Sequence, residues 1–271
     1  MPNSYEHSYQ HDLDNVIDAS DAVLAIGTEK VDTTTLKDRS LSGNDATIYG
    51  AMRASGYFDG GRILDGVDDY LDVEHTQIRT TLQSNTQTII CLFKSNSVTT
   101  QQCIAGLSKT IGTTANKTSI VGLINSKLTY DTHNISSIVK RVQTDVIQNN
   151  QIYCIFATYD GIEQKISIDG GDETTIAQTG MLKEIHSSYI SQIGRGNESS
   201  TSYDELNGSI FVTLLFSHSL TQSKKKSFFN TLARLPLYSH RFTQYPNSDT
   251  SLTSIFPYTS GIITSGSFNK T

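Results

Sequence analysis

Tryptophan is absent from this 271-residue sequence, which also has only four prolines and three cysteines. Without an indole ring, the chain cannot bind a sugar by stacking it on tryptophan, although tyrosine can take the same role. Cys91, Cys103 and Cys154 are an odd number without close spacing, and each lies in an apolar stretch. We therefore predict reduced, buried thiols and folding in a cytoplasm.

Long apolar runs are missing as well. The longest extends from Ile210 to Phe216 and contains Thr213, which suits a buried strand and is too short to span a membrane. The N-terminal stretch MPNSYEHSYQHD has neither the basic nor the apolar region of a secretory signal. The sequence thus predicts no membrane insertion and no signal peptide.

Clustered positive charge is scarce, since the formal net charge is -6 and the pI is about 5.6. Binding to a phosphate backbone depends on grouped Lys and Arg side chains, so we exclude nucleic acid as a partner. The one basic run, Lys224 to Lys226, is expected to be a solvated helix face.

Strand-forming residues supply most of the patterned positions, and polar loops rich in Ser and Thr separate them. The clearest pattern is the pair of apolar runs at 152–158 and 162–168, which flank Asp160-Gly161. Asp-Gly between alternating hydrophobic residues is a strong hairpin signal, because Gly adopts positive φ without a steric penalty. The sequence therefore predicts an all-β, antiparallel fold.

One helix is expected near the C-terminal end of this pattern. Thr221 is its predicted N-cap, Phe228, Phe229 and Leu232 lie on one face, and Pro236 ends it. All-β sandwiches of this size often form a single domain, so we assign residues 16–235 to one domain.

Polar, unpatterned segments flank the predicted domain. Residues 1–15 and 236–271 are expected to be arms that contact neighbouring chains, because neither has the apolar residues to fold alone. His7 and His11 in the first arm would share a face only in a helix, which the pattern does not support, so we predict no metal there.

Five stretches carry a resemblance to a known family, and they occur in this order: LKDRSLSGNDATIYG, FDGGRILDGVDDYLDV, IYCIFATYDGIEQKISIDG, ISQIGRG and LNGSIFVTLLFSHSLTQSKKKSFFNTL. Together they resemble the laminin-G-like, concanavalin A-like lectin-glucanase jelly-roll family over about residues 15–235. The resemblance implies a sandwich of two curved antiparallel sheets with a short helix after the last core strand. Members of this family serve as glycan-binding modules, adhesion domains and parts of virus and bacteriophage particles, and some relatives hydrolyse glycosides.

The chain departs from the family pattern at three positions. Ile152 stands where the family often has Trp, and Phe211 and Val212 match an acidic pair that in relatives can help to hold calcium. The sequence therefore lacks two features on which ligand binding in the family often depends.

Catalytic carboxylates are not apparent. Hydrolase relatives carry theirs on one strand in an E-x-D-x-x-E pattern, which this sequence lacks. Asp204 and Glu205 are adjacent, so in a strand they would face opposite sides, and we expect a solvated loop. Ser217-His218-Ser219 lacks the Gly-rich elbow of a hydrolase nucleophile. We predict that the chain is not an enzyme.

The acidic turn DGVDDYLDV contains the candidate metal ligands Asp65, Asp68 and Asp69. Ca²⁺ prefers six to eight oxygen ligands, and three carboxylates with nearby carbonyls could supply several of them. The alternative, which we favour, is a polar turn in which Asp65-Gly66 reverses the chain while Asp68 and Asp69 cap backbone amides. We assign no other cofactor.

Several tyrosines could supply contacts to a sugar or a protein, although half-buried positions in a sheet are the more common outcome. They are Tyr57, Tyr70, Tyr130, Tyr189 and Tyr203.

Two functions of different classes follow from these observations. The first is a non-enzymatic structural or attachment protein of a virus or bacteriophage particle, such as a capsid-surface, fibre or baseplate component. Its arms would bind other virion proteins or copies of itself, its jelly roll could bind host-surface glycans, and it would reside in virions assembled in the host cytoplasm. The alternative is an extracellular carbohydrate-binding or adhesion module of a secreted or cell-surface protein, which rests on the family alone.

Overall fold

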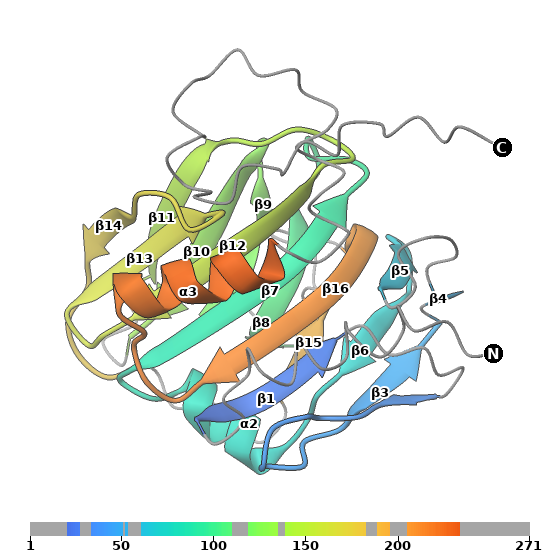
Figure 1. The fold of residues 1–271 in the computed structure, drawn as a ribbon, viewed down its shortest axis with the longest axis horizontal. Helices are drawn as coiled ribbons and strands as arrows, with labels where there is room; N and C mark the ends of the chain where they lie inside the picture. The colour runs from blue at the N-terminus through green and yellow to red at the C-terminus, as the bar shows by residue number, and fades with distance from the viewer. Residues whose placement is uncertain are drawn as a thin grey trace, which may run out of the picture.

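The computed structural model describes residues 21–27, 34–50, 52–53, 61–109, 119–134, 139–182, 189–195 and 205–233. These residues form two antiparallel sheets that pack face to face as a jelly-roll sandwich (Figure 1). The predicted fold class is confirmed. Both predicted arms, 1–15 and 236–271, lie outside the described residues and remain predictions.

Sheet A has eight strands. Along the sheet they are β14 (Thr174–Ala177), β13 (Glu163–Ile168), β12 (Ile152–Tyr159), β7 (Gln87–Ser95), β16 (Asn207–Phe216), β5 (Arg62–Asp65) and β4 (Met52–Arg53), with β1 (Ala22–Gly27) also pairing with β16. The predicted hairpin is confirmed: β12 pairs with β13 in antiparallel register, and Gly161 in the turn has a φ of 90°.

Sheet B also has eight strands. In order they are β11 (Val139–Val146), β10 (Lys127–His133), β9 (Ser119–Ile124), β8 (Gln102–Lys109), β15 (Tyr189–Ile193), β6 (Tyr70–Asp72), β3 (Ala46–Tyr49) and β2 (Thr35–Leu36).

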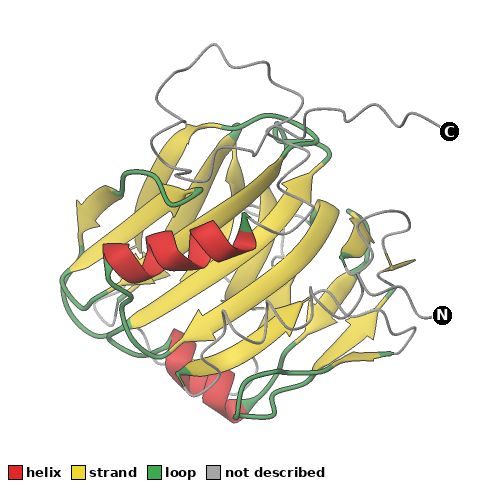
Figure 2. Cartoon of the chain, viewed as in Figure 1, coloured by secondary structure: helices red, strands yellow, loops and turns green. Residues whose placement is uncertain are grey.

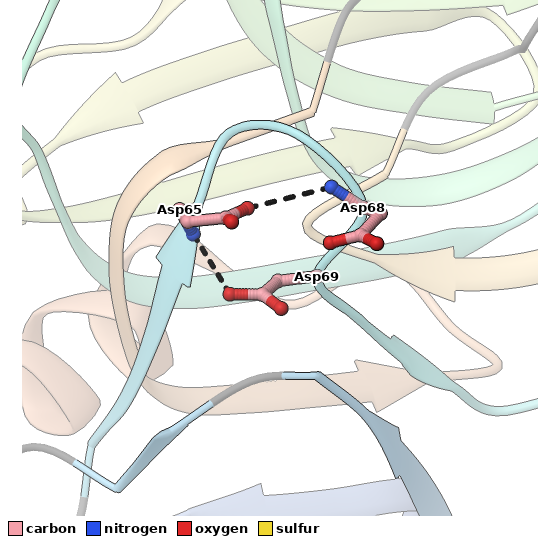
Figure 3. A group of neighbouring side chains, drawn as sticks. All are labelled: Asp65, Asp68 and Asp69. Atoms are coloured by element: carbon pink, nitrogen blue, oxygen red, sulfur yellow. Dashed lines mark hydrogen bonds between the residues drawn. The ribbon is translucent and has the colours of Figure 1, made fainter.

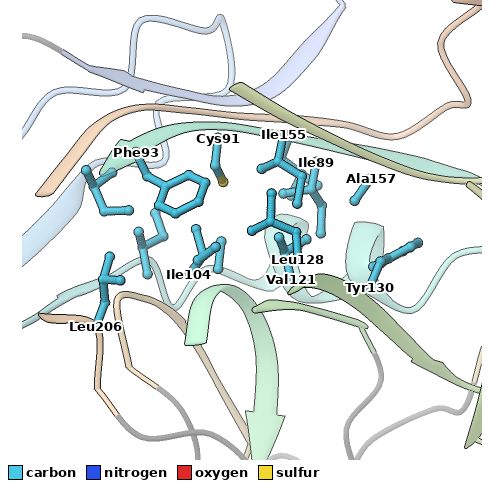
Figure 4. Close-up of a cluster of buried hydrophobic side chains, with 14 of the residues drawn as sticks. Ile89, Cys91, Phe93, Ile104, Val121, Leu128, Tyr130, Ile155, Ala157 and Leu206 are labelled. Atoms are coloured by element: carbon cyan, nitrogen blue, oxygen red, sulfur yellow. The ribbon is translucent and has the colours of Figure 1, made fainter. Parts of the chain in front are cut away.

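The main core lies between the sheets, where alternate side chains of each strand meet (Figure 4). Ile89, Cys91 and Phe93 of β7 face Ile104 and Val121 of sheet B across this layer. All three cysteines are buried and none of them forms a disulfide, so the prediction of reduced thiols is confirmed. Burial raises the pKa of Cys91 to about 12, which leaves that thiol inert.

A second apolar cluster covers the outer face of sheet A, and helix α3 (Gln222–Leu232) completes it. Figure 2 shows this helix lying across the face of the sheet. The side chain of Thr221 accepts a hydrogen bond from the backbone N–H of Lys224, so the predicted N-cap is confirmed. Phe228 and Leu232 are buried against Phe156 and the other members of this cluster. The helix therefore shields one side of the sandwich.

The prediction of a solvated basic face on α3 is wrong for one residue. Lys225 is only 1% exposed, and its Nζ lies 2.6 Å from Oε1 of Glu173 in the segment before β14. Lys224 remains largely exposed and lies 3.5 Å from Asp21. The helix turns the middle lysine toward the sheet, where a carboxylate neutralises it.

A short helix, α2 (Thr76–Leu82), was not predicted. It has no side-chain N-cap bond and contains three threonines, which have low helix propensity. Burial of Ile78 and Leu82, four residues apart, places one face of this helix against the core. Neither helix in the described part of the chain has the length and apolarity needed to cross a membrane.

The loop between β2 and β3 is organised around Asp38. Oδ1 of Asp38 accepts hydrogen bonds from the backbone N–H groups of Ala25 and Ser40 at 2.8 and 2.9 Å. Oδ2 accepts from the Ser40 hydroxyl at 2.6 Å and from the backbone N–H of Asn44 at 2.7 Å. The polar stretch LKDRSLSGND is therefore a structural loop that fastens β1 to the start of sheet B.

Candidate functional site

The acidic turn carries the chain from β5 in sheet A to β6 in sheet B (Figure 3). Oδ1 of Asp65 accepts hydrogen bonds from the N–H groups of Val67 and Asp68 at 2.8 and 3.4 Å. Oδ2 of Asp69 accepts the N–H of Asp65 at 2.9 Å. Asp65 and Asp69 thus bind backbone amides as turn residues do. Asp68 contributes its N–H, and its carboxylate accepts no hydrogen bond from a described residue.

The three carboxylates lie close together, with one oxygen of each within 4.8 Å of the others. Asp65 and Asp68 are exposed, and Asp69 is buried. Burial raises the pKa of Asp69, and the negative charges of Asp65 and Asp68 raise that pKa further. The hydrogen bond from the backbone N–H of Asp65 acts in the opposite direction. The turn is therefore a concentrated source of negative charge.

Calcium remains a proposal for this turn. Four of the six carboxylate oxygens of Asp65, Asp68 and Asp69 accept no hydrogen bond from any described residue. Those four fall short of the six to eight oxygens that Ca²⁺ prefers, so backbone carbonyls or water would have to complete the shell.

A pair of tyrosines lies directly beside the acidic turn. Tyr49 ends β3, Tyr70 begins β6, and the two residues are register partners in sheet B. Their rings are stacked, with centroids 4.6 Å apart and planes 10° from parallel. Since Ile48 and Leu71 pack into the core, the two tyrosines project from the opposite, outer face of the sheet. We call Tyr49 and Tyr70 the tyrosine platform.

The platform is fixed on one side and open on the other. The guanidinium carbon of Arg195 lies 4.7 Å from the centroid of the Tyr70 ring, and Nε of Arg195 lies 3.4 Å from Oε1 of Glu205. Tyr49 is 45% exposed, which is unusual for a large ring in this structure. A cation–π contact and a stacked neighbour hold the rings in place while Tyr49 faces solvent.

Polar side chains continue along the same face of the sheet. Asp72 follows Tyr70 by two residues and is the register partner of Gln192 in β15. Oδ1 of Asp72 accepts the backbone N–H of Glu74 at 2.9 Å, and Oδ2 accepts no hydrogen bond from a described residue. Burial raises the pKa of Asp72, and the nearby His75 opposes this. Asp72 can therefore accept a hydrogen bond from a ligand that lies on the platform.

Of the singled-out tyrosines whose side chains the structure describes, Tyr70 lies at this site and Tyr130 does not. The idea that Tyr130 is available for contacts is wrong, because it is fully buried and accepts a hydrogen bond from Nε2 of Gln87 at 2.9 Å. Tyr57 and Tyr203 lie outside the described residues, as does the side chain of Tyr189. The sequence analysis missed Tyr49 because its place in the site depends on pairing with Tyr70 in another strand. The residues around Tyr49 give no sign of that pairing.

The other candidate residues do not form a catalytic arrangement among the described residues. Asp204, His7 and His11 lie outside them, and Glu205 is half-buried and paired with Arg195 instead of lying in a solvated loop. The ring of His218 packs edge-on against Phe216, with centroids 5.7 Å apart. Phe211 and Val212, which stand where relatives carry an acidic pair, are both buried in the second apolar cluster.

The sequence matches no protein-family model and no curated protein. Solved structures, however, share its fold. The binding domain of botulinum neurotoxin serotype D/C matches with a TM-score of 0.58 and 16% identity, covering 81% of this chain and 53% of that one. The serotype D ligand-binding domain, solved with N-acetylneuraminic acid, matches with a TM-score of 0.57 and 15% identity, covering 81% and 52%. A Trypanosoma rangeli sialidase, solved with sialic acid, matches with a TM-score of 0.57 and 12% identity, covering 86% and 38%.

At these levels of identity the likeness concerns the fold alone. It agrees with the concanavalin A-like sandwich that the sequence resemblance implies. The chain spans about half the length of the neurotoxin binding domains and a smaller part of the sialidase.

Proposed function

We propose that this jelly roll is a carbohydrate-binding module that acts without catalysis, and that the tyrosine platform is its sugar-binding surface. The observation that carries the proposal is the exposed ring of Tyr49, held in a fixed orientation by its stacking on Tyr70. One face of a pyranose ring presents mainly C–H groups, which pack well on a flat aromatic ring. A preoriented ring binds with a smaller loss of side-chain entropy than a mobile one.

Hydrogen-bonding groups next to the platform support the same ligand class. The Oδ2 atom of Asp72 can accept from a sugar hydroxyl, and Glu205 lies beyond Arg195 at the other side of Tyr70. Sites for small polar ligands combine an apolar or aromatic surface with a few such polar groups. The combination suits a sugar better than a purely apolar ligand.

The structural neighbours add support of a weaker kind. One is a toxin ligand-binding domain in complex with N-acetylneuraminic acid, and another is a sialidase in complex with sialic acid. A shared fold does not fix a shared function, so the proposal depends on the platform itself.

A glycan array followed by calorimetry with the best ligand tests the proposal. Tyr49→Ala should weaken binding by about tenfold or more, because it removes a central aromatic contact. Val146→Ala is the matched control, since Val146 is 65% exposed on β11 at the opposite edge of sheet B and should leave binding unchanged. An array without any ligand, or a Tyr49→Ala variant that binds like the wild type, would overturn the proposal.

A structural or attachment role in a virus or bacteriophage particle is a setting in which such a module could act. This second proposal rests on the polar segments 1–15 and 236–271, whose composition suits arms that bind virion proteins or further copies of the chain. Limited proteolysis distinguishes the settings. If residues 1–15 and 236–271 become resistant to protease only in an assembly, the role in a particle is favoured. If they stay sensitive to protease in every assembly, that role is contradicted.

A further inference from the structure

We infer that the tyrosine platform selects uncharged sugars and disfavours sugars that carry a carboxylate. This inference rests on the proposed function and adds the class of ligand. The expected preference differs from the ligands of two structural neighbours, which were solved in complex with sialic acid and N-acetylneuraminic acid. The argument comes from the distribution of charge around Tyr49 and Tyr70.

The acidic turn is joined to the platform at two points. Asp69 directly precedes Tyr70, and its carboxylate lies against Gly50, the residue after Tyr49. The contact is so close that a Cβ on Gly50 would lie 1.9 Å from Oδ1 of Asp69. Asp65 and Asp68 lie within 4.8 Å of that carboxylate and face solvent. Three carboxylates therefore lie together beside the ends of β3 and β6 that carry the two tyrosines.

The remaining charges near the platform do not offset this. Asp72 adds a fourth carboxylate on the same face of the sheet, two residues from Tyr70. Arg195 is the cation in contact with the platform, but Glu205 lies beside it as a counter-charge. The guanidinium of Arg195 also already packs on the ring of Tyr70.

The arginine of β5, Arg62, does not reach this surface. Arg62 is 4% exposed and lines a small interior space with Ile26, Leu36 and Leu71. A carboxylated sugar on Tyr49 would thus meet mainly negative charge among the described residues. Placing like charges together is an effective way to reject a wrong ligand.

The test compares two glycans that share one core and differ only in a terminal sialic acid, both titrated into the whole chain in buffer with EDTA. At 50 mM salt we expect the uncharged glycan to bind about fivefold more tightly. At 500 mM salt the ratio should approach one, because salt screens the repulsion between exposed charges.

Two variants localise the effect. Asp68→Asn should lower the low-salt ratio by about half, since it removes one exposed charge whose side chain makes no hydrogen bond with a described residue. Asp145→Asn, an exposed acid on β11, is the control and should leave the ratio unchanged.

The outcomes separate this inference from the proposed function. Equal or tighter binding of the sialylated glycan at 50 mM salt, with binding still lost in Tyr49→Ala, would overturn the inference and leave the module intact. Failure of both glycans to bind, after a full array has also given no ligand, would remove the proposed function and the inference with it.

Discussion

The carboxylate of Asp38 accepts a hydrogen bond from the backbone N–H of Ala25 at 2.8 Å and so ties the loop before β3 to β1. The same carboxylate accepts three further hydrogen bonds, two from Ser40 and one from Asn44. Four donors on one charged acceptor make this loop a fixed part of the fold.

Asp38→Asn should therefore destabilise the protein strongly. The Asn side chain keeps one acceptor oxygen, which can still accept two of the four hydrogen bonds. Its NH₂ group is itself a donor and replaces the second oxygen, so the other two donors lose their acceptor. We expect a loss of about 3 kcal/mol in the free energy of unfolding, measured by urea denaturation. Asp145→Asn, on an exposed site, serves as the control. An Asp38→Asn variant as stable as that control would contradict the role of the loop.

The buried ion pair between Lys225 and Glu173 gives a second prediction. Glu173→Gln leaves the buried ammonium without its counter-charge and should cost about 3 kcal/mol of stability. Lys225→Met removes the buried charge itself and should cost less, because an apolar side chain suits this position. Urea denaturation of both variants provides the comparison. A larger loss in Lys225→Met would show that the charge itself stabilises the fold.

The same lysine predicts a pH dependence. Burial lowers the pKa of Lys225 below its usual 10.5, although Glu173 opposes the shift. Just below pH 10.5 the unfolded chain retains a proton that the folded chain releases, so stability rises with pH there. The wild type should gain stability relative to Lys225→Met as pH rises toward 10.5, with no relative change near pH 7. Thermal unfolding across pH 7–10.5 measures this, and a constant difference would refute it.

The acidic turn predicts separable effects of its three aspartates. If Ca²⁺ binds there, millimolar calcium should raise the melting temperature, because a ligand that binds only the folded state stabilises it. Asp68→Asn should abolish that rise and leave the calcium-free protein at least as stable as the wild type. The Asp68 side chain makes no hydrogen bond with a described residue, and its neutralisation lessens the repulsion among the three carboxylates. Asp65→Ala should destabilise even the calcium-free protein, because it removes the Oδ1 atom that accepts the N–H of Val67 and holds the turn. Identical melting curves with calcium and with EDTA would exclude the metal.

Local patterns predicted the fold well where neighbouring residues decide the structure. The β12–β13 hairpin follows from Asp160-Gly161, and the start of α3 follows from Thr221. In each case, turn or capping chemistry acts over a few residues. Helix α2 escaped prediction because tertiary burial of Ile78 and Leu82 outweighs its weak propensity.

The candidate site was harder to predict because it depends on long-range pairing. Tyr49 and Tyr70 are 21 positions apart, and only the register of β3 with β6 brings their rings together. Arg195 arrives from the end of β15, still further along the chain. Similarly, the burial of Lys225 depends on Glu173, which a charge count along the sequence cannot reveal. The acidic turn and Tyr70 could be singled out from the sequence, whereas Tyr49 and Arg195 join them only through the pairing of strands in the sheet.

The most direct test of the account is an NMR titration of tyrosine-labelled protein with the tightest glycan found on an array. If the platform binds sugar, the ring signals of Tyr49 and Tyr70 should shift first and saturate at the affinity measured by calorimetry. The signal of the buried Tyr130 ring should stay in place. Saturable shifts elsewhere on the protein, with the Tyr49 ring unmoved, would contradict the assignment of the sugar-binding surface.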